Sequence, residues 1–468
     1  MMPILVRRRN IRVLPVVALA ALLAACGGRS APPAGTPEPR QSGIANRRTS
    51  AGPEFDASRL YTQMGFLSTG APLPFVGAVS YLATPNQDST DVTIGLSLAN
   101  ASLSFARDND RFIAGYTVNL ALRQGGSVVR DISAHEAVRV ASYKETSRLD
   151  ESIVFQQGVV LAPGQYALSA SIRDDATGRA TTQEMLITVP RLGAPGTLST
   201  PVPYLQVAPR RARTELANLV VNPRATVAFG RDSIIGLYVE GYGDGPRLPL
   251  SVEVRNDAGR VLWRDTLSLP RRGDLFSGVA YIPVSKVGIG ISVASLWATG
   301  QADTTRAPVF VTFGEGLPVA KFDDMIQYLR WFASSYRLKV LRDAAPEARP
   351  EAWTTFVKET DSSPLTPVNE DLVDYFSRLM EVAGRYREEG TPGWMTDRGK
   401  VLLGLGEPDQ VYDQGLAGMG TRGRSQVWEY RRLNIQLVFY DQTGFDRWRL
   451  TNSSEMAFQT AWQRRVTR

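Results

Sequence analysis

Between residues 72 and 191, apolar and polar positions alternate in short runs that are divided by turn residues. A period of two is typical of β-strands with one buried side and one solvent-facing side. Many short strands at near-regular spacing predict a β-sandwich, which we place at residues 59–193. The runs lie at residues 75–83, 91–99, 112–122, 136–143 and 166–172.

The same pattern restarts after a Pro- and Gly-rich break at residues 190–203. Asp257-Ala258-Gly259 interrupts one long run and indicates a hairpin turn. We therefore expect a second sandwich at residues 194–314. Its alternating runs lie at residues 234–242, 248–269, 277–284 and 290–298.

One segment of the first module resembles a known architecture. Residues 161–166 read Leu-x-Pro-Gly-x-Tyr, and the strand that begins there resembles the penultimate strands of immunoglobulin-like and fibronectin-like modules. The resemblance implies that both all-β modules are immunoglobulin-like sandwiches. It carries no information about a ligand.

After Gly316 the period changes from 2 to 3.6, which predicts helices. We expect an amphipathic helix over 321–343, a shorter one around Trp353, and a third over 368–389. The third has Asn369 near its start and Gly390 as a stop signal. Beyond it the period returns to two, and the expected strands lie at 400–406, 426–433, 435–441 and 445–450. Residues 315–468 are thus predicted to form an α+β domain, with helices first and a small antiparallel sheet after them.

The N-terminus has the pattern of an export signal. Four Arg residues within the first twelve precede an apolar run at 13–23 that is too short for a permanent membrane span. The run ends in Leu23-Ala24-Ala25-Cys26, which resembles the bacterial lipoprotein box. Residues 1–25 are then a signal peptide, and Cys26 becomes the acylated N-terminus, carrying chains such as palmitate. The alternative is a plain secretory signal with an incidental cysteine.

The position after Cys26 is Gly27, without the Asp that signals inner-membrane retention, so the outer membrane is the expected location. Residues 26–58 are rich in Gly, Pro and Ser and read as a flexible tether. Anchoring would then come from the lipid alone, with the body facing either the periplasm or the cell surface.

Composition excludes several chemistries. Cys26 is the only cysteine and His135 the only histidine, so neither an internal disulfide nor a common zinc site is available. The formal charge of +7 falls to about +3 when the four Arg of residues 1–25 are removed, which argues little for nucleic acid. We expect no cofactor and no metal. A Ser-His-Asp catalytic triad would have to use His135, which we interpret as a surface or turn residue beside a strand.

The densest motif lies at residues 393–412. Gly393-Trp394-Met395-Thr396-Asp397-Arg398-Gly399 comes first, then Gly404-x-Gly406-x-Pro408-Asp409, then Trp428-x-Tyr430 and Phe439-x-Asp441. This combination resembles the GWxTD domain found at the C-terminus of bacterial lipoproteins and other secreted proteins, over roughly residues 320–450. The resemblance implies an envelope protein and no particular reaction.

The motif itself is interpreted as a corner that defines the fold. Gly393 would permit a sharp turn after the third helix, and Trp394 would fill the junction between helices and sheet. Thr396 and Asp397 would bond exposed backbone groups of the turn, and Arg398 and Gly399 would lead into the strand at 400–406. Pro408 and Asp409 fit a turn, since Asp is favoured where its carboxylate accepts nearby N–H groups. Trp428 fits a core strand.

A functional interpretation stays open beside the structural one. In that interpretation, Asp397, Asp409, Asp441 and Asp446 are the candidates for the paired carboxylates of a glycan hydrolase. The tryptophans, six of the eight after residue 314, fit either core packing or sugar stacking. Residues 418–423, Gly-x-Gly-x-x-Gly, lack the helix that a dinucleotide site needs. We interpret them as a hairpin loop presenting Arg422 and Arg424, either solvated or meeting an anionic partner such as lipopolysaccharide phosphate or an acidic protein patch.

The sequence therefore predicts an outer-membrane lipoprotein that acts without catalysis, as an interaction or scaffold protein in envelope assembly or secretion. A protein partner of the envelope is expected. The alternative is a surface carbohydrate-binding protein or glycan-acting hydrolase using carboxylates near Asp397.

Overall fold

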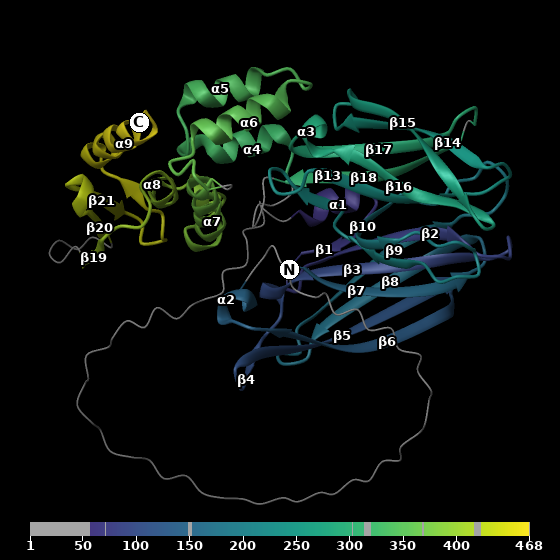
Figure 1. Cartoon of the computed structure of the whole chain (residues 1–468). Coiled ribbons are helices and arrows are strands. Elements are labelled where there is room, and N and C mark those ends of the chain that lie inside the picture. The colour runs from purple at the N-terminus through teal and green to yellow at the C-terminus, as the bar shows by residue number, and fades with distance from the viewer. Residues whose placement is uncertain are drawn as a thin grey trace, which may run out of the picture. The chain divides into compact units, whose positions relative to one another are not determined.

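The computed structural model describes residues 57–70, 72–147, 152–301, 303–312, 320–366, 369–415 and 423–467, all within one compact unit, Thr49–Arg468. The chain is β-rich, with several sheets followed by a helical C-terminal region (Figure 1). The predicted signal peptide, Cys26 and nearly all of the tether lie outside the described residues. Within the described residues, no helix combines the length and the apolar character needed to cross a membrane.

The first module consists of two antiparallel sheets whose inner faces share one hydrophobic core. The first sheet has the order β1-β2-β3-β7, and the second has the order β4-β5-β8-β9 with β6 paired to β5. The predicted strands at 75–83 and 91–99 match β2 and β3. The elements are α1 (Ser58–Gln63), β1 (Leu67–Thr69), β2 (Phe75–Ala83), β3 (Thr90–Ala99), η2 (Asn100–Ser102), β4 (Ala106–Asp108), β5 (Arg111–Gln124), β6 (Ser127–Val140), α2 (Tyr143–Thr146), β7 (Ser152–Leu161), β8 (Gly164–Asp174) and β9 (Ala180–Val189).

The second module is a nine-stranded path, β11-β10-β13-β16-β15-β14-β17-β18-β12, antiparallel except for the pairing of β12 with β18. The expected hairpin joins β14 to β15, with Gly259 at φ +76 in its turn. The elements are β10 (Val202–Ala208), β11 (Asn218–Val221), β12 (Thr226–Ala228), β13 (Ile234–Gly241), β14 (Arg247–Asn256), β15 (Val261–Arg272), β16 (Leu275–Pro283), α3 (Val284–Val287), β17 (Gly290–Ala298) and β18 (Thr304–Thr312).

A buried polar network joins the two β-modules. Arg210 and Glu240 form an ion pair with Nε and Oε1 2.6 Å apart, and their side chains are 2% and 0% exposed. Arg210 Nη2 also donates to Ala83 O at 2.5 Å, and Tyr242 Oη accepts from Ala83 N at 2.8 Å. Residues from β2 and from the second module are therefore held by one set of hydrogen bonds.

The C-terminal region packs helices around a four-stranded antiparallel sheet, β19-β20-β21-β22. Its helices are α4 (Phe322–Tyr328), η3 (Leu329–Trp331), α5 (Ser335–Asp343), α6 (Arg349–Glu359), α7 (Glu370–Arg385), η4 (Gly393–Met395), α8 (Asp397–Leu405), η5 (Arg431–Leu433) and α9 (Asn452–Val466). Its strands are β19 (Gln410–Gly415), β20 (Arg424–Tyr430), β21 (Ile435–Asp441) and β22 (Arg449–Leu450).

Three predictions for this region are wrong in their details. The helix expected over 321–343 is divided, because the Ser334 side chain accepts a hydrogen bond from Arg337 N and starts α5 anew. The run 400–406, predicted as a strand, belongs to helix α8. The predicted order, helices first and the sheet after them, is incomplete, because helix α9 follows the sheet at residues where no element was predicted. Asn369 does cap α7, as its position indicated.

Candidate functional site: the corner between α7 and α8

The GWxTD residues form a tight connection between two helices. Gly393 to Met395 make the single turn η4, and Thr396 then caps helix α8. Thr396 Oγ1 accepts from Gly399 N at 3.1 Å and donates to Gly393 O at 2.8 Å. The capping residue itself was not recognised from sequence. Arg398 and Gly399 therefore lie in the first turn of a helix and do not lead into a strand.

The two motif glycines are needed for space. A Cβ on Gly393 would lie 2.0 Å from Val382 O, and one on Gly399 would lie 1.9 Å from Gly393 O. Both distances are far below van der Waals contact, so the backbones of α7, η4 and α8 meet only because these side chains are absent. Gly393 was expected to permit a sharp turn, but its φ is not positive. Glycine is needed at this position because the backbone of Val382 approaches too closely for a side chain.

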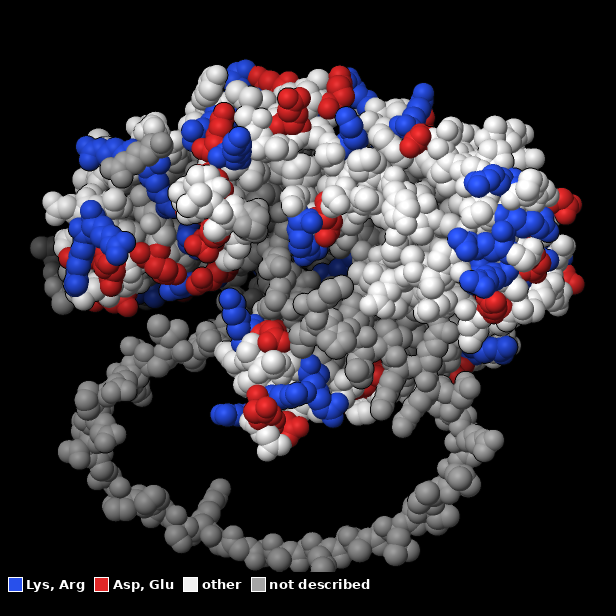
Figure 2. All heavy atoms as spheres, viewed as in Figure 1, with Lys and Arg blue, Asp and Glu red and all other residues white. Residues whose placement is uncertain are grey.

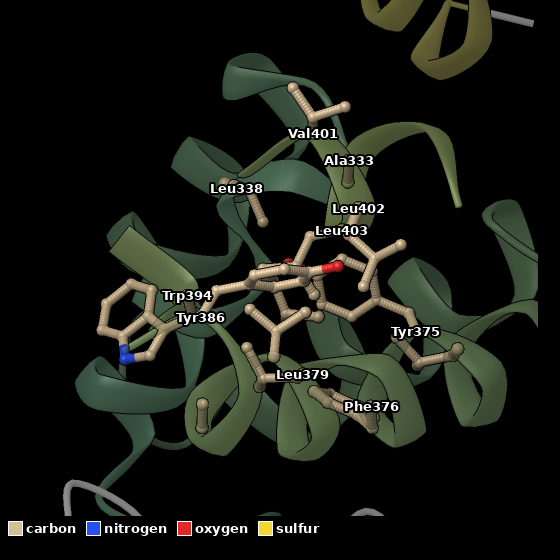
Figure 3. Packing of buried hydrophobic residues seen from close by; sticks show 14 of the residues in the cluster. Ala333, Leu338, Tyr375, Phe376, Leu379, Tyr386, Trp394, Val401, Leu402 and Leu403 are labelled. Atoms are coloured by element: carbon tan, nitrogen blue, oxygen red, sulfur yellow. The ribbon is translucent and has the colours of Figure 1, made fainter. Parts of the chain in front are cut away.

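Trp394 lies in the hydrophobic core and is 4% exposed. Figure 3 shows it at the margin of the cluster whose interior holds Leu379 of α7 and Leu402 of α8. Its ring packs edge-on against Tyr328, with centroids 5.4 Å apart, and the Arg330 guanidinium lies 5.5 Å from the ring centre. Trp394 therefore fills a helix junction.

Asp397 ties the start of α8 to the sheet. Its Oδ2 accepts from Leu450 N of β22 at 2.7 Å, and its Oδ1 lies 3.0 Å from Lys400 Nζ. Lys400 also pairs with Glu455 of α9 at 2.5 Å. Both carboxylate oxygens are thus engaged, one by a backbone donor, and the side chain is only 22% exposed. The bond goes to a strand 53 positions later and not to the turn itself.

Arg398 lies between two aromatic rings. Its guanidinium is 4.9 Å from the ring centres of Tyr386 and Trp448. Burial lowers the pKa of Arg398, and its Nε has no hydrogen-bond partner among the described residues. The nearby Glu388 carboxylate acts against this lowering of the pKa, and both rings attract the cation. This stack joins the motif to the end of α7 and to the segment before β22.

Glu388 is a buried carboxylate of this site that sequence analysis missed. Its Oε1 accepts from Trp448 N at 3.0 Å and its Oε2 pairs with Arg449 at 2.7 Å, and its side chain is 2% exposed. One acidic residue in a charged run, next to Arg387 and Glu389, gives no sequence signal for such a role. The pair of Lys400 and Glu455 was missed because helix α9, which carries Glu455, was not predicted.

Pro408 and Asp409 lie in the loop from α8 to β19, as the turn pattern indicated. Asp409 Oδ2 accepts from Arg431 N at 2.7 Å, and Tyr430 Oη donates to Gly406 O at 2.9 Å. Trp428 is 1% exposed, and its Nε1 donates to Gln426 Oε1 at 2.8 Å. These residues hold the loop against the sheet.

Arg424 does not lie on a loop tip. It belongs to β20, where it pairs with Asp441 at 2.8 Å and with Asp446 at 2.7 Å. Arg422 lies outside the described residues. Burial alone would raise the pKa of Asp441, but hydrogen bonds from Arg424, Thr443 and backbone N–H groups lower it to about 2. Asp441 therefore organises the turn after β21 as an ionised acceptor.

Other candidates for chemistry lie elsewhere. His135 is in strand β6, not beside it, with Nδ1 3.0 Å from Asp175 Oδ2, and its side chain is 71% exposed. In the described part of the chain, no group of three or more His, Cys, Asp or Glu side chains is placed to hold a metal. An open hollow of about 550 Å³ lies between the start of α5 and the end of α9, lined by Ser334, Tyr336, Arg337, Glu359, Val466 and Thr467.

At the level of sequence, no family model and no curated protein matches this chain. Among solved structures, dimeric latent PorU from Porphyromonas gingivalis is similar at 10% identity and a TM-score of 0.24, covering 55% of this chain and 21% of that one. A Bacteroides uniformis β-glucuronidase is similar at 12% identity and a TM-score of 0.16, covering 47% and 26%. A Bifidobacterium dentium β-glucuronidase is similar at 10% identity and a TM-score of 0.17, covering 47% of this chain and 39% of that one. The chain thus spans well under two thirds of these structures, and similarity this low carries no information about function.

Proposed function

We propose that the protein is an acylated outer-membrane lipoprotein whose C-terminal GWxTD domain binds an envelope partner without catalysing a reaction. The observation that supports this most is the state of Asp397. Its two oxygens are engaged by Leu450 N and by Lys400, so the motif carboxylate stabilises a corner of the fold. The polar side chains of the motif then serve the fold, and binding would be carried out by the surface of the domain.

The alternative of a glycan hydrolase fits this geometry less well. Such an enzyme needs two carboxyl groups across an open cleft, with one free to donate a proton. Asp397 and Asp441 are both tied to cations and backbone donors. Trp394, Trp428 and Trp448 are each at most 5% exposed, so none of them offers a ring on which a sugar stacks. Packing accounts for these tryptophans.

The proposed lipid anchor is inferred from the sequence alone. Leu23-Ala24-Ala25-Cys26 after an apolar run provides the site of acylation, and the tether to residue 58 separates the lipid from the folded body. Acyl chains at Cys26 would hold the protein at the outer membrane with its body facing the periplasm or the cell surface.

The β-modules would act as immunoglobulin-like spacers. In the first module two antiparallel sheets share a core, and Tyr166 Oη donates to Ala162 O four residues upstream at 2.8 Å. A tyrosine that bonds back to the backbone at the start of a strand is a feature of immunoglobulin-like sandwiches. The Leu-x-Pro-Gly-x-Tyr segment supplies both partners of this bond.

Cross-linking in living cells tests the proposal. A tagged full-length protein is cross-linked, purified and analysed for bound proteins, beside a Cys26→Ala variant that lacks the acylation site. The proposal expects a defined envelope protein with the wild type and its loss with Cys26→Ala. Recovery of polysaccharide alone, or turnover of a glycan by the purified protein that stops in Asp397→Asn, would favour the alternative.

A further inference from the structure

One tryptophan of the second module lies outside the hydrophobic cores. Trp297 is on β17, whose alternate residues Ala294, Leu296 and Ala298 face the buried core. Since successive side chains of a strand point to opposite faces, Trp297 points away from that core, and it is only partly buried. The other tryptophan of this module, Trp263, packs against the core. Trp297 therefore has a position that packing does not explain.

The polar groups around this ring are not used by the protein. Directly opposite Trp297 in the ladder are Ser251 of β14 and Thr304 of β18. Opposite side chains on one face lie about 5 Å apart, so a hydroxyl flanks the indole on each side. In the described part of the chain, neither hydroxyl nor the indole Nε1 forms a hydrogen bond, and no aromatic ring or cation packs on the indole.

A row of charged and polar side chains runs beside the ring on the same face. Arg264 of β15 lies opposite Glu253 of β14. Further across the sheet, Ser295 of β17 lies opposite both Glu253 and Arg306 of β18. Ser295 precedes Trp297 by two positions, so the row is next to the indole. Three strand spacings separate Arg264 from Arg306, which is about 14 Å.

The acidic residue in this row is already engaged by two arginines. Glu253 Oε2 pairs with Arg264 at 2.5 Å, and its Oε1 pairs with Arg255. The side chain of Glu253 is 9% exposed, whereas those of Arg264 and Arg255 are 65% and 45% exposed. Arg306 is exposed and forms no ion pair with any described residue. The row therefore presents more positive than negative charge to the solvent.

The whole second module is basic as well. Residues 194–314 contain 13 Lys and Arg against 9 Asp and Glu, a formal charge of +4, whereas the chain without residues 1–25 carries about +3. Figure 2 shows basic side chains gathered over this module, at the right of the view. On the outward face of β14, β15, β17 and β18, Glu253 is the only acidic residue, because Asp265 lies opposite the core residue Val252. This charge favours an anionic ligand.

We propose that the outward face of β14, β15, β17 and β18 binds an acidic oligosaccharide, with one sugar ring on Trp297. The apolar C–H face of a sugar packs on the flat indole, which also has a polar N–H group. The hydroxyls beside the indole both donate to and accept from sugar hydroxyls. Arg306 and the unused donors of Arg264 bind carboxylates of the same chain, because a guanidinium is a planar fork that matches a carboxylate.

The inference goes beyond the proposed function, in which the β-modules are spacers and the C-terminal domain binds a protein. Binding at Trp297 requires neither acylation nor that protein. Trp297→Ala is expected to remove oligosaccharide binding and to leave the cross-linked protein partner in place. The two proposals therefore fail separately.

Calorimetric titration of the purified full chain, carrying Cys26→Ala, tests the site. The probe is an oligogalacturonate, which has a carboxylate on each sugar, and the neutral control is maltohexaose. The wild type is expected to bind the oligogalacturonate at least about tenfold more tightly than maltohexaose, and to bind it more weakly as the salt concentration rises.

Variants locate the binding on this face. Trp297→Ala and Arg306→Gln are each expected to weaken oligogalacturonate binding by about tenfold, through loss of the stacked ring or of one charge-assisted contact. Trp297→Phe keeps an aromatic ring and should lose less. Arg130→Gln, the same change at an exposed arginine of β6 in the first module, should change the affinity less than about twofold.

Thermal unfolding followed by circular dichroism controls for folding. Arg306 is exposed, so Arg306→Gln keeps the test valid even if Trp297→Ala lowers the melting temperature. Unchanged binding in Trp297→Ala, equal binding of the two oligosaccharides, or no heat of binding with the oligogalacturonate would overturn the inference. Tighter binding of a poly-glutamate peptide than of the oligogalacturonate would also overturn it, because the face would then recognise an acidic protein.

Discussion

Gly393 and Gly399 hold their positions because neighbouring backbones occupy the space of a side chain. Neither residue has a positive φ, so the left-handed conformations that only glycine adopts easily are not involved. The carbonyl oxygens of Val382 and Gly393 lie where the two Cβ atoms would be. At this scale the motif is a set of contacts that only particular side chains, or their absence, allow.

Replacing Gly399 with Ala should destabilise the C-terminal domain. Alanine gains about 1 kcal/mol from helix propensity. The new Cβ would lie 1.9 Å from the backbone oxygen of Gly393, so backbone atoms would have to shift. The clash should dominate, with a net loss of about 2 kcal/mol in unfolding free energy. Urea unfolding followed by tryptophan fluorescence measures this, because six of the eight tryptophans lie after residue 314.

Gly158→Ala is the matched control. The nearest atom to a Cβ at Gly158 is Asp91 Oδ1 at 3.8 Å, an ordinary contact, so the urea midpoint of the C-terminal domain should not move. A Gly399→Ala variant as stable as the wild type would show that the corner has room to relax.

Asp441 should make the C-terminal domain sensitive to acid. Its hydrogen bonds, set against the cost of burial, lower the pKa of the folded carboxyl from 3.8 to about 2. A group whose pKa is lowered by folding stabilises the folded state above its unfolded pKa, and that stabilisation is lost as the pH falls through the folded pKa. Wild-type stability should therefore decline between about pH 4 and about pH 2.

The measurement compares urea unfolding of the wild type and Asp441→Asn at several pH values. The variant should be less stable near neutral pH, and the difference should shrink as the pH falls through this window. A difference that stays constant down to about pH 2 would contradict the assignment. Asp446→Asn serves as the comparison, because Asp446 pairs with the same Arg424 but is largely exposed.

At the scale of elements, the sequence predicted several periodic segments correctly but missed the division of the helix expected over 321–343 and misassigned a short apolar run. The strands at 75–83 and 277–284 and the helix beginning after Asn369 were foreseen from period and capping. The run 400–406 was assigned to a strand because an apolar run of this length fits either a strand or a buried helix. Thr396 followed by Asp397 is the start signal of a helix, and this signal favours the helix over the strand.

For the candidate site, the sequence predicted the burial of two tryptophans and a bond from Asp397 to the backbone, but not most of the contacts. Trp394 and Trp428 are buried as expected, and Asp397 bonds to backbone. The contacts of Asp397 with Leu450 and of Glu388 with Trp448 were not predictable, since they join segments far apart in the sequence. Lys400 is only three positions after Asp397, and its pairing was missed because residues 400–406 were assigned to a strand.

The cap of α8 should contribute measurably to stability. Replacing Thr396 with Ala removes an acceptor for Gly399 N and a donor to Gly393 O, and the site is only 2% exposed to water. We expect a loss of about 1–2 kcal/mol. Thr396→Ser keeps the hydroxyl and should recover most of it, as measured by urea unfolding with tryptophan fluorescence. Equal losses in the two variants would assign the effect to the methyl group.

At the scale of the whole molecule, the buried Arg210–Glu240 pair links residues of both β-modules. Removing Glu240 alone leaves a buried guanidinium without a counter-charge, which typically costs about 3–5 kcal/mol. We expect Glu240→Leu to destabilise the β-modules by about this amount. Chemical unfolding followed by the circular dichroism of the strands gives the value.

The double variant Arg210→Met/Glu240→Leu is the control for this prediction. It removes both charges, so it should be much closer to the wild type than Glu240→Leu. If the two variants were equally destabilised, lost packing at Glu240 would explain the effect, and the ion pair would not.

The central claim is that Asp397 maintains the fold of the C-terminal domain, and one measurement tests it most directly. The thermal unfolding of the full chain is followed by tryptophan fluorescence for wild type, Asp397→Asn and Asp324→Asn. Asp324 is also in the first turn of a helix, α4, but is exposed, so its variant controls for charge and helix dipole. The account predicts a melting temperature several degrees lower for Asp397→Asn alone, corresponding to about 1–3 kcal/mol. An unchanged melting temperature in Asp397→Asn would contradict a structural role and make this carboxylate a functional group.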